Sequence, residues 1–226
     1  MTVSAVAARS AAVVLLALLT GACATTASRP AAPPAKTTTR DAEVLVLSNG
    51  RTHFFENRRP HCLAYVLDGE WEFAVQSAAL RTADRSRFVG VVLLDAAALP
   101  DPGGGDLVAR AITHLIVDTE KEWGSSARVK VESFAALKPG AVLLEFDEVT
   151  ITRELAGRMT GPNPPVVGST LRLPLRVVAP FDASLVMVVT ALDASDARAI
   201  AGTLEVTEAP QCWRRTIQER FPGALP

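Results

Sequence analysis

The fold is decided by residues 106–124, which read DLVARAITHLIVDTEKEWG. At about 100° per residue, the large apolar side chains of this segment fall on one side of a helix and the polar ones on the other. The apolar set is Leu107, Val108, Ile112, Leu115, Ile116 and Trp123, and the polar set includes Arg110, Thr113, His114, Glu120 and Lys121. Asp106 is a favourable N-cap, and Gly124 ends the pattern. The sequence therefore predicts an amphipathic helix over residues 107–123.

Short apolar segments ahead of this helix have the spacing of β-strands. Residues 44–47 and 63–67 are apolar runs that end at the turn sequences NG and DG. Trp71, Phe73 and Val75 alternate with polar residues, so one side of that segment is expected to be apolar. Residues 88–94 are apolar along almost their whole length, which is typical of a strand in the middle of a sheet.

More strands are predicted after the helix by alternation or by apolar runs. They are residues 129–131, 141–151, 171–177 and 185–190. Because Pro174 cannot donate a ladder hydrogen bond, its strand is expected at a sheet edge or with the proline on the free side.

Two short helices are expected near the C-terminus. Ser195 and Asp196 are expected to cap one that reaches Gly202, and Pro210 to open the other. The predicted fold class is therefore α+β, a mostly antiparallel β-sheet with one long helix, residues 107–123, packed on a face and short C-terminal helices.

Residues 1–22 have the three parts of an export signal. Arg9 is their only charged residue, residues 11–19 are an apolar run, and small residues follow. The run is too short to cross about 30 Å of hydrocarbon as a helix. The segment is therefore interpreted as a signal peptide and not as a transmembrane anchor.

The end of this segment, LTGAC at residues 19–23, resembles the lipobox of bacterial lipoproteins. Leu19 stands one position earlier than is usual, and Thr20 takes the usual leucine position. The resemblance implies that the Cys23 thiol receives a diacylglycerol, that the signal is cut before Cys23, and that the freed amine is acylated, for instance with palmitate. Such a protein is held to a bilayer by two or three acyl chains. The alternative is ordinary secretion with a chance cysteine near the cleavage site.

The expected organisation has three parts. Residues 1–22 are the signal peptide, residues 23–40 are the lipidated Cys23 and an Ala/Pro/Thr-rich tether, and residues 41–226 are a single globular domain. Ala24 is not the aspartate that resembles an inner-membrane retention signal. The expected location is the bacterial cell envelope, with the outer membrane favoured if two membranes are present.

Cys62 and Cys212 are the cysteines that remain in the expected globular domain. In an exported protein two such thiols favour a disulfide bond, here across a loop of about 150 residues. The alternative is two separate buried thiols.

No catalytic or metal-binding residue is predicted. His53, His61 and Cys62, with His114 and Cys212, are residue types that bind zinc, but their spacing fixes no two ligands on one element. His114 lies four residues after Arg110 and four before Asp118, which favours a surface ion-pair ladder over a catalytic base. The glycines at 103–105 lack the lysine of a phosphate loop.

The formal net charge is −1 with no basic stripe, which argues against nucleic-acid binding. The order of the predicted elements is a tryptophan beside a hairpin, two strands, a long helix, a meander, a buried strand and a closing helix. Over about residues 60–207 this order resembles the Mog1/PsbP-like fold. That family is similar to small scaffold and assembly proteins, mostly without catalytic residues, and no functional residue is carried over.

The expected function is that of a membrane-tethered, non-catalytic binding or assembly module of the bacterial envelope. It contacts the membrane through its lipid anchor and offers a sheet face or a helix groove to an envelope protein, with no cofactor. The alternative is a periplasmic hydrolase of unknown substrate that uses His114 or His61. A hydrolase needs a pocket that holds a titratable residue with a second polar group in reach, whereas a binding module is expected to expose an apolar patch.

Overall fold

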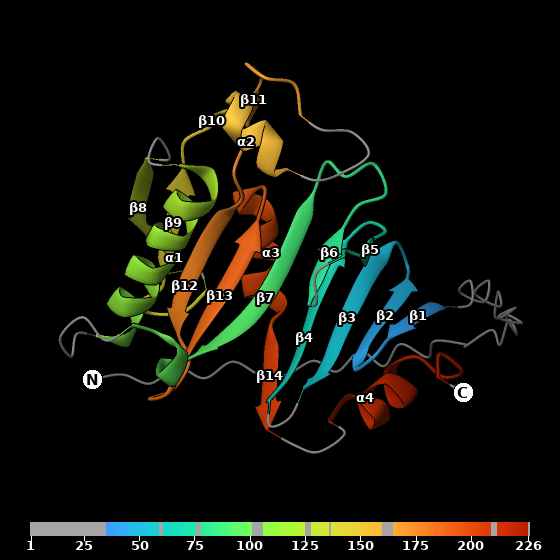
Figure 1. Ribbon diagram of the computed structural model, residues 1–226. Helices are drawn as coiled ribbons and strands as arrows, with labels where there is room; N and C mark the ends of the chain where they lie inside the picture. The colour runs from blue at the N-terminus through green and yellow to red at the C-terminus, as the bar shows by residue number, and fades with distance from the viewer. Residues whose placement is uncertain are drawn as a thin grey trace, which may run out of the picture. The chain divides into compact units, whose positions relative to one another are not determined.

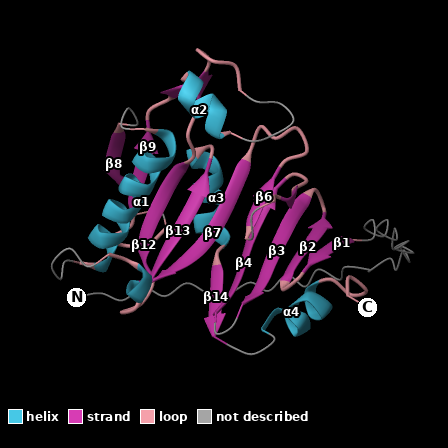
Figure 2. Cartoon of the chain, in the orientation of Figure 1, coloured by secondary structure: helices cyan, strands magenta, loops and turns pink. Residues whose placement is uncertain are grey.

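The computed structural model describes residues 35–225, except for 59–60, 76–77, 101–105, 125–127, 136, 160–164 and 209–211. Two antiparallel β-sheets dominate this part of the chain (Figure 2). Sheet A has the strand order β1-β2-β3-β4-β14, and sheet B has the order β5-β6-β7-β13-β12-β9-β8. With one helix of 17 residues and shorter helices beside the sheets, the predicted α+β class is confirmed.

Sheet A is built mainly from consecutive hairpins. Its strands are β1 (Lys36–Arg40), β2 (Glu43–Ser48), β3 (Arg51–Arg58), β4 (His61–Asp68) and β14 (Glu205–Glu208). Asn49 and Gly50 join β2 to β3 with φ angles of 52° and 72°. Both residues of this turn are therefore left-handed, as the predicted NG hairpin requires.

The first strand, β1, lies in residues 36–40, ahead of the position where the sequence predicts the start of the globular domain. The absence of large apolar residues predicts a tether at Lys36–Arg40, yet these residues pair with β2 along their whole length. Three consecutive threonines suit a strand, because β-branched side chains fit the pleated surface. Because an edge strand needs few buried side chains, the low hydropathy of residues 36–40 is compatible with a strand.

Sheet B carries the longest apolar strands. Its members are β5 (Glu72–Phe73), β6 (Ala79–Arg81), β7 (Phe88–Asp95), β8 (Val129–Ser133), β9 (Val142–Phe146), β12 (Leu175–Pro180) and β13 (Leu185–Ala191). A separate pair is formed by β10 (Val149–Thr150) and β11 (Thr170–Leu171). The predicted interior positions of residues 88–94 and 185–190 are confirmed.

Two local predictions about sheet B are corrected. The edge position offered as one alternative for the strand with Pro174 is wrong, and the apolar side expected for residues 71–75 is shorter than predicted. Residues 171–177 form two short strands with Pro174 between them, and β12 lies between β13 and β9 instead of at an edge. Pro174 precedes β12, so its missing N–H removes no ladder bond. Val75 follows β5 and is 93% exposed, so the apolar side expected for residues 71–75 ends at Phe73.

Helices of the described residues cover or join the sheets (Figure 1). They are α1 (Leu107–Trp123), α2 (Arg153–Arg158), α3 (Ala194–Thr203) and α4 (Cys212–Arg220), and a single 3-10 turn covers Ala96–Ala98. Helix α1 packs on β12 and β13, α3 packs on β4 and β13, and α4 packs on β3. Helix α3 therefore connects the two sheets, while α1 and α4 lie on different sheets.

Three apolar clusters follow this layering. One joins sheet A residues such as Phe54 and Tyr65 to sheet B residues such as Val91 and Val177, with α3 beside them. A second lies between α1 and the opposite face of sheet B, and a third lies between α4 and the opposite face of sheet A. Each sheet is therefore packed on both faces.

The bounds predicted for the long helix are confirmed, whereas its cap differs. Asp106 occupies the N-cap position of α1 but makes no capping hydrogen bond with its side chain. Gly124 ends the helix with a φ of 93°, a conformation that favours glycine. In α3 the capping residue is Asp193, whose carboxylate accepts from the Ser195 amide at 2.7 Å, and not Ser195 or Asp196.

Replacing Leu115 by alanine is expected to lower the free energy of unfolding by about 2 to 3 kcal/mol. Leu115 is 8% exposed and belongs to the cluster under α1, so the truncation leaves a cavity. Lys121→Ala on the same helix is the matched control and should change stability by less than about 0.5 kcal/mol, because that side chain is 73% exposed. Urea denaturation measures both, and equal losses would contradict the orientation of α1.

Candidate functional site

The predicted lipid-anchor residues lie outside the described part of the chain. Residues 1–22 and Cys23 fall there, so the signal peptide and the lipidation site stay predictions. Within the described ranges, none of the helices combines the length and hydropathy that crossing a bilayer requires.

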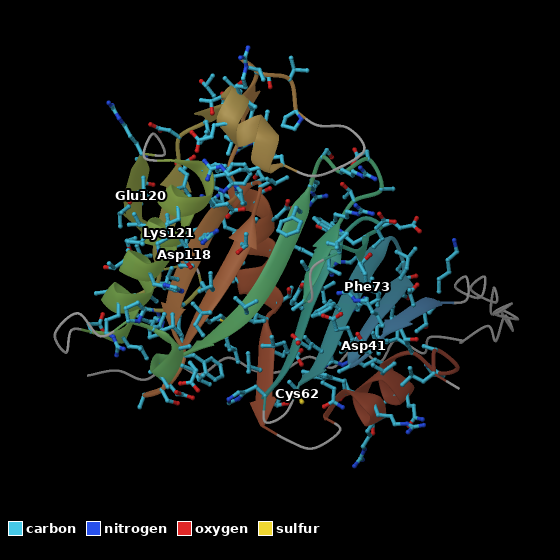
Figure 3. All side chains as sticks on the ribbon, viewed as in Figure 1. Asp41, Cys62, Phe73, Asp118, Glu120 and Lys121 are labelled. Carbon is cyan, nitrogen blue, oxygen red and sulfur yellow. The ribbon has the colours of Figure 1, made fainter. Side chains whose placement is uncertain are left out.

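Cys62 is the second residue of β4 and is fully buried in the cluster that α4 covers (Figure 3). Trp213 belongs to the same cluster and donates its indole N–H to the Glu56 carbonyl oxygen at 2.9 Å. Residue 57 is the cross-strand partner of Cys62, so this bond brings the start of α4 to the end of the β3–β4 pair. The side chain of Cys212 lies outside the described residues, and its pairing with Cys62 stays a prediction.

The three histidines lie in three different places. His114 Nε2 is 3.3 Å from Asp118 Oδ2 on the outer part of α1, so the predicted pair is confirmed. Arg110 does not continue the ladder, because its guanidinium donates to the carbonyl oxygens of Leu99 and Pro100, each at 3.0 Å. Asp118 lies 3.8 Å from Lys121 instead (Figure 3).

His53 lies on the face of sheet A that α4 covers. Its ring is 4.7 Å from that of Phe221. Burial, and then the charges of Arg51 and Arg220, lower the pKa of His53 below its usual value. A neutral ring packed on a phenyl group is a structural contact, and His53 lines none of the hollows described below.

His61 lines a small cavity of about 160 Å³ between sheet A and sheet B. Glu56 lies at the same cavity and is 2% exposed, while the other lining residues are apolar. The ring of His61 stacks edge-on against Phe181 at 5.3 Å. The sequence draws attention to His61 but not to Glu56, because a glutamate in a strand of alternating residues is expected on the solvent-facing side.

A second buried carboxylate belongs to Glu43, the cross-strand partner of Glu56. Glu43 is 4% exposed, receives hydrogen bonds from Arg40 at 2.6 and 2.8 Å, and also accepts from the Ala78 amide. Burial, together with Glu56 and Glu43, holds the pKa of Tyr65 well above its usual value. Sheet A therefore carries a polar cluster on its inner face, toward sheet B.

A groove of about 360 Å³ separates α4 from sheet A. Phe55, Trp213 and Ile217 give it an apolar lining, and Asp41 and Arg214 also lie at it. It continues the cluster that holds α4 on the sheet.

A third hollow, larger than the two above, lies on sheet B beside the C-terminal end of α1, and is called the sheet groove below. It encloses about 460 Å³. Its lining includes Gly90 and Val92 of β7, Thr190 of β13, Phe88, Trp123, Glu122 and Arg176. Helix α1 packs on β12 and β13, and β7 lies on the far side of β13 from the helix (Figure 1). Part of the sheet face therefore stays open.

The open part of the face has the marks of a binding surface. Val92 is 37% exposed although β7 is an interior strand. Gly90 is paired with Thr190 and lines the groove, and the Ala78 carbonyl oxygen lies 3.3 Å from the position that a Cβ at Gly90 would take. An indole, a phenyl ring and a guanidinium adjoin the apolar surface, which is a composition common in ligand sites.

Arg176 sets this groove apart from the other two. Among the described residues its side chain forms no hydrogen bond and no ion pair, and its guanidinium lies 6.0 Å from the centre of the Phe146 ring. Burial lowers the pKa of Arg176, and the more distant carboxylates of Glu122 and Asp118 act in the opposite direction. The groove therefore holds a partly desolvated cation without a close anionic partner.

Within the described ranges, no group of three or more His, Cys, Asp or Glu side chains is arranged to hold a metal ion. Comparisons with protein-family models, with curated proteins and with solved structures return no match to this chain.

Proposed function

We propose that this protein is a membrane-tethered lipoprotein of the bacterial envelope whose domain is a non-catalytic binding or assembly module. The sheet groove is its binding site, and an envelope component is its partner. The LTGAC sequence at residues 19–23 supports the anchor. The proposed likeness to the Mog1/PsbP-like fold is in keeping with this role.

One observation carries the binding role. The sheet groove is an apolar surface on an otherwise packed sheet, and it is bordered by Trp123, Phe88 and Arg176. Aromatic and arginine side chains dominate binding energies at interfaces because they combine large apolar area with directed hydrogen bonds. A surface of this kind favours a role in recognition.

A second candidate is a periplasmic hydrolase. The observation that favours it is the cavity between the sheets, where His61 and the buried Glu56 line the same hollow. A carboxylate beside an imidazole is a combination that general acid–base catalysis uses. The cavity of about 160 Å³ is small for a substrate, which places this candidate second.

A charge at Val92 tests whether the domain needs the groove. Because Val92 also lines the cavity of His61 and Glu56, only the comparison with the histidine variants below separates the binding role from the catalytic one. Val92→Glu in the chromosomal copy is expected to reproduce the deletion phenotype while the protein stays folded and membrane-bound. Val131→Glu is the matched control, because Val131 is 52% exposed on β8 of the same sheet and does not line the groove. It should retain wild-type function.

The catalytic candidate predicts a different result. His53, His61 and His114 are replaced together by glutamine in a separate strain, with folding checked by circular dichroism. Wild-type function in this strain supports the binding module. If the strain instead behaves like the deletion while Val92→Glu is normal, the hydrolase is supported and the groove is not the functional site.

Lipidation is tested separately. Radiolabelled palmitate is expected to enter the wild-type protein and to be absent from Cys23→Ser, because the thiol is the proposed acceptor. Cys62→Ser, which keeps Cys23, serves as the control and should still be labelled. Equal labelling of the wild type and Cys23→Ser would refute the anchor without bearing on the groove.

A further inference from the structure

We infer that the sheet groove binds a single-chain fatty acid, with the carboxylate on Arg176 and the aliphatic chain along the sheet. This inference rests on the proposed function, whose binding site it assigns a ligand class. It follows from the charge at one side of the groove, the apolar surface and the volume.

The charge argument begins with Arg176. A guanidinium that loses water without gaining a partner is costly, and proteins usually offset that cost with an ion pair or hydrogen bonds. Elsewhere in the described chain partly buried arginines have such partners, as Arg87 has in Asp196 and Arg40 has in Glu43. Arg176 has none at hydrogen-bond distance within that part of the chain. Its planar fork of donors fits two oxygens of one anion.

The carboxylates on α1 do not take this role. Neither Glu122, which also lines the groove, nor Asp118 forms an ion pair with Arg176 within the described residues, and Asp118 is engaged by His114 and Lys121. Both belong to the helix side, so an incoming anion approaches from the open side over β13 and β7. The same carboxylates disfavour a ligand with several negative charges, which favours a monoanionic carboxylate over a multiply charged head group.

The apolar argument concerns the rest of the groove. Val92, Gly90 and Thr190 lie on neighbouring strands with Phe88 close by, and four strands contribute to the lining. With strands about 4.8 Å apart, four of them span roughly 14 Å. A flexible aliphatic chain fits such a surface, and each buried methylene contributes about 0.8 kcal/mol before ordering costs. The volume of about 460 Å³ lies in the range of small-molecule sites.

The test measures palmitate binding to the purified full-length mature protein by isothermal titration calorimetry below the micelle concentration. Palmitate is expected to bind at one saturable site. Arg176→Met, which keeps an apolar stem, should weaken binding about 10- to 100-fold, as loss of a charged hydrogen bond predicts. Arg172→Met is the matched control, because Arg172 is exposed and does not line the groove. It should bind palmitate like the wild type.

Two further probes define the ligand class. Hexadecanol, with the same chain and no charge, should bind the wild type and Arg176→Met equally. Acetate alone should not compete, since it lacks the chain. Saturable palmitate binding that Arg176→Met leaves unchanged would overturn the assignment of the carboxylate. Competition by a short peptide with a free C-terminus, but not by palmitate, would replace the lipid with a peptide.

The failure of this inference differs from the failure of the proposed function. If the wild type does not bind palmitate while Val92→Glu still reproduces the deletion phenotype, the fatty-acid assignment is wrong and the groove remains the binding site. If Val92→Glu abolishes palmitate binding but leaves function normal, the groove binds the lipid and the proposed function fails.

Discussion

Replacing Arg87 by methionine is expected to destabilise the domain by about 3 to 5 kcal/mol. The Arg87 guanidinium donates to both carboxylate oxygens of Asp196 at the start of α3, and the Asp196 side chain is only 1% exposed. This hydrogen bond raises the pKa of Arg87 above its usual value. Removing the cation leaves a carboxylate buried without its partner, which is far more costly than losing a surface pair. Methionine keeps an apolar stem near Trp71, whose ring lies 4.7 Å from the guanidinium carbon.

Guanidinium denaturation of Arg87→Met and of a matched control measures this effect. Arg81→Met removes an arginine that is paired at 2.8 Å with the half-exposed Glu72, and should cost less than about 1 kcal/mol. The double variant Arg87→Met with Asp196→Leu should recover part of the loss, because neither charge is then buried alone. Equal costs for the two single variants would show that burial of Asp196 does not govern the pair.

Reduction of the proposed Cys62–Cys212 bond is expected to have an effect of similar size. The bond closes a loop of about 150 residues, for which the chain-entropy estimate is about 5 kcal/mol as an upper value. The free energy of unfolding should therefore fall by up to this amount in the presence of reductant. The same reductant should leave a Cys62→Ala/Cys212→Ala double variant unchanged, which makes that variant the control.

Intact mass checks the bond directly. Alkylation in denaturant without reductant should add no mass at Cys62 or Cys212, and alkylation after reduction should modify both. Denaturant is needed because Cys62 is fully buried in the folded protein. Modification of both thiols before reduction would refute the bond.

The long helix and the main hairpins could be predicted because their signals are local. Seventeen residues of amphipathic periodicity determine α1, and the left-handed Asn49-Gly50 turn determines how β2 meets β3. The alternation of apolar and polar residues over 171–177 predicted one strand, but the chain forms two strands there, with Pro174 between them. Alternation reports which face a side chain takes, but not which strand lies beside it.

The candidate sites could not be predicted because they depend on contacts between distant segments. Glu43 and Glu56 occupy positions that read as solvent-facing, yet strand register places them opposite each other on the inner face of sheet A. The sheet groove combines residues from β7, β13, β12 and α1, which are up to about 100 residues apart in the chain. In the sequence Arg176 is one polar residue of the alternating segment 171–177, and nothing nearby in the chain reveals that its side chain lacks an ion partner.

Strand β1 determines how the domain responds to a pull on its N-terminal side. A force applied to the chain ahead of Lys36 acts first on Ala35, which packs against the cluster under α4, and then on the ladder between β1 and β2. The rest of β1 resists little by packing, because it is an edge strand with mostly exposed side chains. Detaching its five residues lengthens the connection by roughly 17 Å, at about 3.3 to 3.6 Å for each extended residue. Detachment of β1 thus lets the distance between the domain and the chain on its N-terminal side increase while the rest of sheet A stays paired.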